Sequence, residues 1–166
     1  MAILRQTGDS RTNQANQGIE ERLAALEGAE AARNLLAKYA AAVDAQDLKA
    51  ISSLLDRTVA LSAGEMTVEG YENVVDFFKS AFATDPSEKS HFVTNMTPRW
   101  LGDSTVSIDA YFLWTAGEQS KSIIGWGTYS TRVKVKDGVG KFTKIVLTIR
   151  HMGEIGEGWK LTSEPV

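Results

Sequence analysis

Apolar residues recur at steps of three and four positions along the first part of the chain. The stripe runs from residue 19 to residue 43, with Ile19, Leu23, Leu26, Leu35, Leu36, Tyr39 and Val43 as its members. This period predicts an amphipathic helix, and the many alanines between these positions favour the same structure. Gly28 interrupts the stripe, and we expect the helix to break there, between an N-terminal arm and the main helix.

Two shorter helices and a hairpin are predicted next. Asp47 is a residue type that caps helices, and it precedes the apolar segment 48–55. Residues 71–83 carry Val and Phe at positions suited to packing from a helix. Between these two helices, residues 58–70 predict a small hairpin that turns near Gly64.

From residue 91 onward the pattern becomes that of β-strands. We predict four strands, over residues 91–100, 105–115, 121–136 and 141–153. The last two are joined through an Asp-Gly pair, which favours a tight hairpin. Helices followed by long consecutive strands indicate an α+β fold with a curved, mostly antiparallel sheet.

The predicted strands are apolar on both faces. In residues 105–115, Tyr111 and Leu113 lie on one face, and Val106, Ile108, Ala110, Phe112 and Trp114 lie on the other. Antiparallel strands of this kind usually have both faces covered, and the helices can cover only one. We therefore expect a partner subunit on part of the second face, so that the chain forms a homo-oligomer.

Composition places the chain among single-domain globular proteins. It has 166 residues, of which 43% are hydrophobic and 23% charged, enough to bury a core without covalent staples. We interpret residues 1–17 as a flexible leader and residues 18–166 as one domain. The chain has no cysteine, which excludes disulfides, thiolate metal sites and a cysteine nucleophile.

Charge and hydropathy argue against two classes of partner. A net charge of −3 does not favour binding to nucleic acid. The apolar start of the chain is too short for a signal peptide, and no apolar run is long enough to span a membrane. We therefore expect a cytoplasmic protein with neither a nucleic-acid nor a membrane partner.

One segment, residues 132–150, is locally basic. Its cations are Arg132, Lys134, Lys136, Lys141, Lys144 and Arg150, and Asp137 is its only carboxylate. Lysines that keep a solvated hairpin edge soluble would explain this pattern. An anion-binding patch is the alternative.

The two histidines, His91 and His151, are candidates for chemistry. His91 lies in "KSHFVTN" at the start of the first long strand, where alternation places Asn95 on the same face. His151 has no partner that the sequence identifies. The chain contains no HExxH, no GxSxG and no phosphate loop. We therefore expect no metal site and no nucleotide or flavin cofactor.

The order of these segments resembles a known family. The long helix ending in "YAAAVDAQD", the helix "YENVVDFFKSAF", the strand "SHFVTNM" and the paired strands "GTYSTRVKVKDGVGKF" are similar to SnoaL-like and scytalone-dehydratase-like proteins of the nuclear transport factor 2-like superfamily. The similarity covers residues 20–153. It implies a cystatin-like, cone-shaped α+β barrel in which three N-terminal helices close the sheet around one apolar pocket. It also implies a homo-oligomer, a trimer in preference to a dimer.

The resemblance also implies site residues. Dehydrating and dehydrohalogenating members use an Asp–His pair, which corresponds to Asp44 and His91 here. A tyrosine five residues before the aspartate matches Tyr39, and Arg150 is the nearest counterpart of an arginine in the bile-acid dehydratase. A carboxylate that fixes one imidazole nitrogen leaves the other free as a base, which suits proton removal beside a carbonyl or a leaving group.

Each assignment has a structural alternative. Asp44 is alternatively an exposed residue at the end of a helix. His91 is alternatively a structural histidine that binds the backbone at the start of a strand, and Tyr39 is alternatively a core residue. Asn95 either bonds a substrate or is a structural amide. The aromatic residues form either a substrate-binding wall or plain core; they are Trp100, Phe112, Trp114, Trp126 and Tyr129.

Together these features predict a cofactor-independent lyase or isomerase, dehydratase-like or cyclase-like, that acts on a small apolar cyclic or aromatic substrate. A non-catalytic module of the same fold, which binds a small molecule or serves in assembly, is the alternative. A dioxygenase small subunit would be one such module, and an obligate large subunit would distinguish it.

Overall fold

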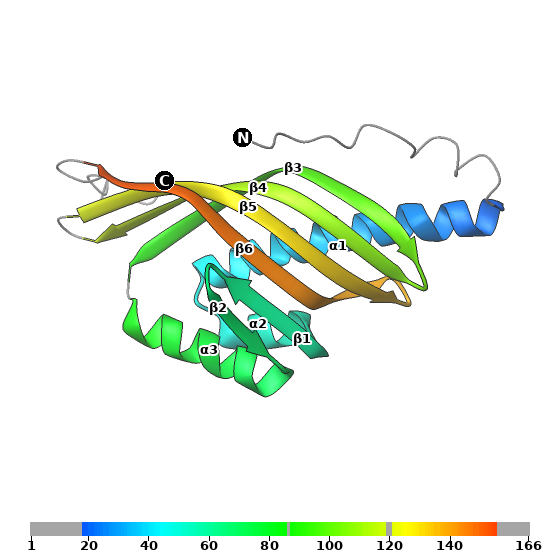
Figure 1. Cartoon of the computed structure of the whole chain (residues 1–166), viewed down its shortest axis with the longest axis horizontal. Coiled ribbons are helices and arrows are strands. Elements are labelled where there is room, and N and C mark those ends of the chain that lie inside the picture. Colours follow the sequence, from blue (N-terminus) through cyan, green and yellow to red (C-terminus); the bar gives the residue numbers. More distant parts are fainter. Residues whose placement is uncertain (1–17, 86, 119–120, 156–166) are drawn as a thin grey trace, which may run out of the picture.

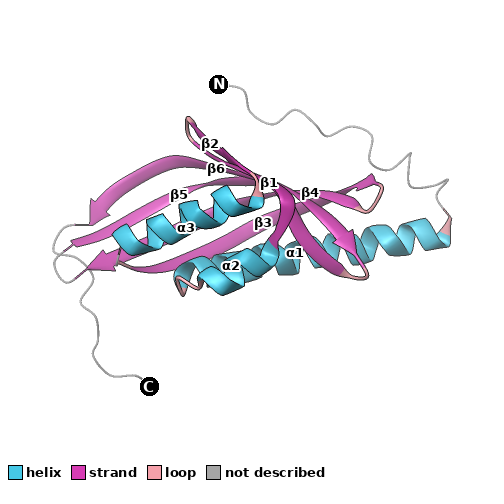
Figure 2. Cartoon of the chain, turned by 90° about the horizontal axis from the view of Figure 1, so that it is seen from below, coloured by secondary structure: helices cyan, strands magenta, loops and turns pink. Residues whose placement is uncertain are grey.

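Three helices lie along one side of a six-stranded sheet (Figure 1, Figure 2). The computed structural model describes residues 18–85, 87–118 and 121–155. The helices are α1 (Ile19–Asp44), α2 (Leu48–Leu54) and α3 (Tyr71–Thr84). The strands are β1 (Leu55–Ala63), β2 (Met66–Glu69), β3 (Glu88–Gly102), β4 (Thr105–Glu118), β5 (Lys121–Lys136) and β6 (Val139–Ile155). The predicted leader lies outside the described residues.

The sheet has the strand order β2-β1-β6-β5-β4-β3. Every neighbouring pair is antiparallel except β1 and β6, which run parallel. The predicted α+β fold is confirmed, and all four long strands form where the alternation places them. The edge strands β2 and β3 do not pair with each other, so the curved sheet is open rather than closed into a barrel.

Helix α1 is continuous, so the predicted break at Gly28 is wrong. Gly28 is buried where α1 crosses β3 and β4, and a Cβ atom there would lie 2.8 Å from Cζ3 of Trp100 and 3.1 Å from Cγ2 of Val106. The glycine therefore allows the helix backbone to approach the sheet closely. Gly28 marks a packing contact and not a helix end.

The short elements follow local sequence signals. Asp47 caps α2, since its carboxylate accepts a hydrogen bond from the main-chain N–H of Ala50 at 2.9 Å. Gln46 has a φ of 51°, a left-handed conformation that turns the chain sharply between α1 and α2. The predicted hairpin forms from β1 and β2, and Gly64 supplies a φ of 61° at its turn.

The core fills the space between the helices and the inner face of the sheet. Tyr39 on α1 lies at its centre and makes edge-on ring contacts with Phe78 of α3, Tyr129 of β5 and Phe142 of β6, at centroid distances of 6.1, 5.9 and 5.6 Å. Such aromatic pairs contribute about 0.5–1.5 kcal/mol each beyond their buried area. One side chain therefore joins two helices to two strands.

The outer face of the sheet also carries apolar side chains. Phe92, Leu113 and Trp126 occupy directly opposed positions on β3, β4 and β5, and 54%, 39% and 47% of their respective surfaces remain exposed. No helix of the described chain covers this row. The partner subunit expected on this face stays a prediction.

Strands β5 and β6 lie inside the sheet, between β1 and β4. The interpretation of the basic segment 132–150 as a hairpin edge is therefore wrong, because neither strand is an edge.

Among the described helices, none is long and apolar enough to cross a membrane.

The packing at Gly28 gives a stability prediction. An alanine in a free helix would be favoured by about 1 kcal/mol, but the crowding against Trp100 costs about 1–3 kcal/mol. We expect Gly28→Ala to lower the free energy of unfolding in a urea titration. In a Trp100→Leu background, which removes the crowded ring, the same substitution should be neutral or stabilising. Stabilisation by Gly28→Ala in the parent chain would contradict this packing.

Candidate active site

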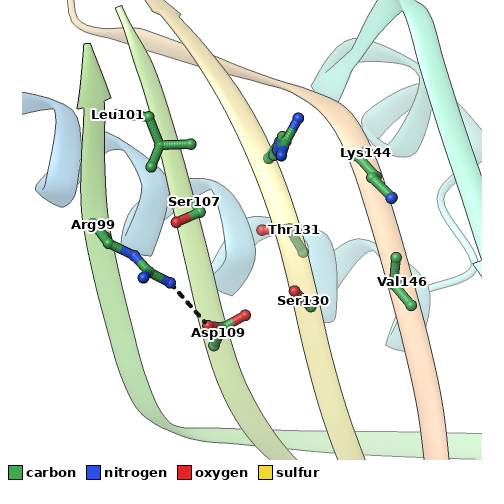
Figure 3. Close-up of a pocket in the computed structure, with 9 residues that line it drawn as sticks. Arg99, Leu101, Ser107, Asp109, Ser130, Thr131, Lys144 and Val146 are labelled. Carbon is green, nitrogen blue, oxygen red and sulfur yellow. Dashed lines mark ion pairs between the residues drawn. The ribbon is translucent and has the colours of Figure 1, made fainter. Parts of the chain in front are cut away.

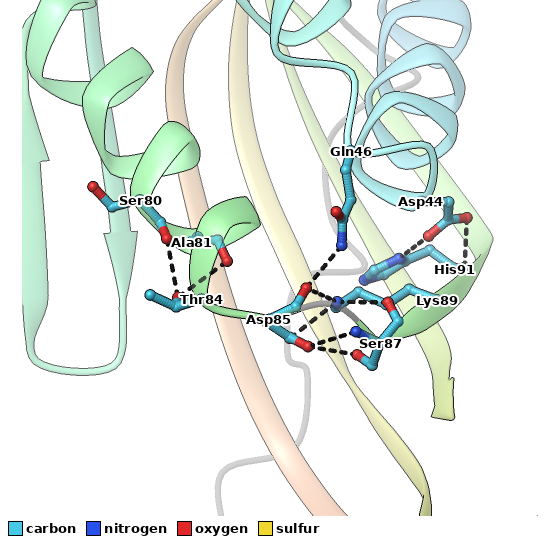
Figure 4. Close-up of polar contacts among 9 residues, drawn as sticks. All are labelled: Asp44, Gln46, Ser80, Ala81, Thr84, Asp85, Ser87, Lys89 and His91. Carbon is cyan, nitrogen blue, oxygen red and sulfur yellow. Dashed lines mark hydrogen bonds and ion pairs between the residues drawn. The ribbon is translucent and has the colours of Figure 1, made fainter. Parts of the chain in front are cut away.

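A hydrogen-bonded aspartate and histidine connect the end of α1 with the beginning of β3. Asp44 is the last residue of α1, and one carboxylate oxygen, Oδ1, lies 2.5 Å from Nδ1 of His91. The other oxygen, Oδ2, accepts the main-chain N–H of His91 at 2.9 Å (Figure 4). Because both oxygens contact the same residue, the carboxylate fixes the ring and the strand together.

The ring of His91 lies against aromatic residues and is largely buried. Its ring stacks on Trp114 at a centroid distance of 6.4 Å and an interplanar angle of 21°, and Phe112 lies 6.3 Å away. The side chains of His91 and Asp44 are 12% and 25% exposed. The imidazole atom Nε2 has no hydrogen-bond partner among the residues that the structure describes. It is the ring nitrogen available to a ligand.

A second polar group anchors the start of β3 (Figure 4). The carboxylate of Asp85 accepts hydrogen bonds from the main-chain N–H and the hydroxyl of Ser87, at 3.2 and 2.6 Å. It also pairs with Nζ of Lys89 at 3.0 Å. The amide of Gln46 donates to the main-chain oxygen of Asp85 at 2.8 Å. The turn after α1 and the strand bearing His91 are therefore tied to one point.

This network alters the ionisation of Asp85. Burial opposes the charged form, but the hydrogen bonds from Ser87 and Lys89 outweigh it and hold the pKa of Asp85 below its ordinary value. The charged carboxylate is therefore the form that holds the start of β3.

Two glycines of "GWG" shape the surface beside His91. A Cβ at Gly125 would lie 2.7 Å from Nε1 of Trp114, and a Cβ at Gly127 would lie 2.7 Å from Cζ of Phe112. Only residues without a side chain leave room for these two rings to lie across β5. Two glycines two positions apart in an apolar strand are the sequence signal for such a close approach.

The same face continues onto β6. Met152 is directly opposite Gly125, and Ile149 is directly opposite Gly127; the two side chains are 61% and 51% exposed. They therefore share the face of the sheet that bears His91. We call this surface the inner floor, and it consists of Phe112, Trp114, Gly125, Gly127, Ile149 and Met152. It is apolar and partly open to solvent.

Two tyrosines lie deeper on this side of the sheet. Tyr39 and Tyr129 are 4% and 3% exposed, and the Phe112 ring lies 4.7 Å from that of Tyr129. Burial raises the pKa of Tyr39 well above its ordinary value. Burial also raises the pKa of Tyr129, with smaller contributions from Tyr39 and from the Asp44 carboxylate. Both phenols therefore stay protonated at neutral pH.

Three of the predicted site residues lie elsewhere. Asn95 is exposed, with a φ of 52°, where a bulge between Thr94 and Thr97 interrupts the alternation of β3. The prediction that it shares the face of His91 is wrong, since Met96 takes the core-facing position.

Trp126 and Arg150 also differ from the prediction. Trp126 lies on the outer face, where its ring is 4.5 Å from that of His151, so it does not contribute to the inner floor. Arg150 is exposed at a bulge of β6, between the paired positions of Ile149 and His151. No group of three His, Asp or Glu side chains within the described chain could hold a metal ion.

Comparison with known proteins identifies the family. The model of the SnoaL-like domain matches residues 24–146, more than half of the chain. The chain belongs to the SnoaL-like family. No curated protein matches this SnoaL-like chain at the sequence level.

Solved structures share the fold of this SnoaL-like protein. Hexachlorocyclohexane dehydrochlorinase LinA-type3 from Novosphingobium barchaimii LL02 is 20% identical, with a TM-score of 0.71 over 81% of this chain and 94% of that one. A candidate scytalone dehydratase from Novosphingobium aromaticivorans DSM 12444 is 15% identical, with a TM-score of 0.68 over 82% and 94%. A protein of unknown function with a cystatin-like fold, from Nostoc punctiforme PCC 73102, is 15% identical, with a TM-score of 0.61 over 70% and 86%. At these identities the likeness establishes the SnoaL-like fold.

The Asp85 network gives a pH-dependent prediction. Because the pKa of Asp85 is lowered in the folded protein, its contribution is present above the unfolded value of about 3.9 and is lost as the pH falls through the folded value. We expect Asp85→Asn to reduce the free energy of unfolding at pH 7 by about 1 kcal/mol. The difference from the parent should shrink at pH 3, as urea titrations at the two pH values would measure.

The exposed Asp76 provides the matched control for this substitution. Asp76→Asn removes the same charge from α3 without touching the network, so it should leave stability unchanged at both pH values. Equal stability of Asp85→Asn and the parent at pH 7 would show that the network does not hold the strand.

Proposed function

We propose that this SnoaL-like protein is a cofactor-independent lyase or isomerase in which His91 is the general base and acid and Asp44 is its orienting carboxylate. One observation supports this most strongly. The carboxylate of Asp44 accepts hydrogen bonds from both the ring Nδ1 and the main-chain N–H of His91, and among the described residues Nε2 has no hydrogen-bond partner. One carboxylate thus orients the imidazole and fixes the main chain that bears it.

The geometry determines which ring nitrogen is the base. A carboxylate only accepts hydrogen bonds, so Nδ1 of His91 carries the hydrogen that it donates to Asp44. The lone pair of the neutral ring is then on Nε2. The negative charge of Asp44 also stabilises the imidazolium that forms when Nε2 takes a proton.

An elimination fits this arrangement. Nε2 of His91 removes a proton from a carbon atom, the C–H electrons form a carbon–carbon double bond, and the adjacent bond breaks as the leaving group departs with its electron pair. The proton on Nε2 then passes to a departing hydroxide to give water, or to solvent when a halide leaves. In an isomerisation the same proton returns to another carbon of the substrate. General acid–base help of this kind supplies about 10²–10⁴-fold in rate.

The two buried tyrosines suit the role of hydrogen-bond donors. Burial keeps Tyr39 and Tyr129 protonated, so neither acts as a base at neutral pH. A protonated phenol can donate to a carbonyl or hydroxyl oxygen of the substrate and stabilise the negative charge that develops on it. We assign Tyr39 this role, with Tyr129 as its neighbour in the core.

The inner floor indicates the substrate class. Phe112 and Trp114 lie across the glycines of β5, and Met152 and Ile149 extend the surface with exposed apolar side chains. Aromatic rings and thioethers favour flat or cyclic hydrocarbon surfaces. A small, apolar, cyclic or aromatic substrate is therefore proposed, and the dehydrochlorinase and dehydratase of the same fold carry names consistent with this chemistry.

The chain contains its own control for an activity test. We would incubate the protein with small cyclic β-hydroxy ketones and chlorinated cycloalkanes, and follow alkene formation by mass spectrometry. Exchange of ketone α-protons in D₂O, followed by NMR, detects the base even without elimination. His91→Gln should lower either rate by about 10²-fold or more, whereas His151→Gln should retain it, since His151 lies on the outer face beside Trp126.

A rate that is the same in His91→Gln and in the parent would contradict the proposed base. If the parent binds the cyclic ketones but neither exchanges nor eliminates, the non-catalytic binding module becomes the better description. A dioxygenase small subunit would instead require a large-subunit partner.

A further inference from the structure

Three cationic side chains line up across the outer face of the sheet. Arg99, Ser107, Arg132 and Lys144 occupy directly opposed positions on β3, β4, β5 and β6. This row lies on the face opposite the inner floor, because Trp100 and Val133, the chain neighbours of two of its members, pack into the core.

The pairing of Arg132 with Lys144 is energetically unfavourable in the isolated chain. Like charges directly opposite each other on neighbouring strands destabilise a sheet. Neither side chain has an ion pair or a hydrogen bond with any residue that the structure describes. Their strands are interior, so the charges do not protect an exposed edge. Both side chains are exposed on the outer face, where an anion can reach them.

The row borders a hollow of about 360 Å³, shown in Figure 3. This volume is at the lower end of the range for small-molecule sites. The residues around it supply three cations, two serine hydroxyls and one carboxylate; they are Arg99, Leu101, Ser107, Asp109, Ser130, Thr131, Arg132, Lys144 and Val146. Thr131 is buried and donates its hydroxyl to the main-chain oxygen of Ile108. The carboxylate of Asp109 is turned toward Arg99, with an oxygen 3.8 Å from Nη2 (Figure 3).

We propose that this hollow binds a phosphate-type anion. The guanidinium of Arg132 can donate two parallel hydrogen bonds to phosphate oxygens, and the ammonium of Lys144 supplies a second positive charge at its side. The hydroxyls of Ser107 and Ser130 can donate to the remaining oxygens. A bound dianion would also neutralise the repulsion between the opposed cations. The site is separate from His91 and does not depend on the reaction proposed there.

Thermal unfolding in the presence of anions tests the site. At low ionic strength we would add inorganic phosphate, inorganic pyrophosphate or glucose 6-phosphate, and measure Tm together with the dissociation constant by calorimetry. A ligand that binds the folded state raises Tm, and we expect a rise of about 2–4 °C or more at saturation. Comparable binding of the monoester and of free phosphate would identify the phosphate group as the recognised part. Tighter binding of pyrophosphate than of the other two anions would indicate that the ligand is a free polyphosphate.

Two double variants separate a built site from a general charge effect. R132Q/K144Q removes the opposed pair, and R22Q/K136Q removes the same net charge from exposed positions outside the hollow. We expect R132Q/K144Q to weaken phosphate binding by about tenfold or more and to have a higher Tm than the parent without phosphate, since the repulsion is gone. R22Q/K136Q should bind phosphate like the parent.

Three results would overturn the proposal. The first is that the parent binds none of these anions at millimolar concentration. The second is that both double variants weaken binding equally, which would reduce the effect to net charge. The third is that R132Q/K144Q dissociates an oligomer that phosphate does not affect, which would assign the row to a contact between subunits.

Discussion

The carboxylate of Asp44 is the point on which the arrangement of this protein depends. It accepts hydrogen bonds from both the main-chain N–H and the ring Nδ1 of His91, so it joins the last residue of α1 to the beginning of β3. A carboxylate at the negative end of a helix is unfavourable by itself. The two hydrogen bonds compensate for this position, and they fix the imidazole relative to the inner floor.

Other features of the fold serve to bring these two residues together. Gly28 lets α1 lie close to β3 and β4, so that the helix ends beside the strand that bears His91. The hydrogen bonds of Asp85 hold the beginning of that strand against the turn after α1. The buried ring of Tyr39 fixes the helix to α3 and to two strands. The three contacts therefore fix α1 at two points along its length and the beginning of β3 at a third.

Much of this arrangement could be predicted from the sequence. Periodicity gave the three helices and the long strands, because each buries one regular stripe or face. The pair of Asp44 and His91 came from the resemblance to a family, since no spacing rule brings together residues 47 positions apart. The interpretation of Gly28 as a break was wrong, because sequence does not distinguish a glycine that ends a helix from one that permits a close approach.

The remaining differences have two physical origins. Bulges in β3 and β6 shift the alternation by one residue, which moves Asn95 out of the face of His91 and leaves Arg150 exposed. Strand order is the other origin. The parallel pairing of β1 with β6 makes β6 an interior strand like β5, and nothing in residues 132–150 encodes that neighbour. Arg132 and Lys144 therefore do not protect an edge but lie opposite each other on the outer face, with no ion pair to any described residue.

The tautomer of His91 tests the central claim most directly. Long-range proton–nitrogen NMR, at a pH where the imidazole is neutral and with His151→Gln for assignment, reports which ring nitrogen carries the hydrogen. In the parent we expect the hydrogen on Nδ1. In Asp44→Asn the amide oxygen must accept the hydrogen bond from the main-chain N–H of His91, so the amide NH₂ faces Nδ1. Because an NH₂ group donates, Nδ1 must then act as the acceptor, and the ring hydrogen moves to Nε2. The same tautomer in both proteins, or a hydrogen on Nε2 in the parent, would contradict the account.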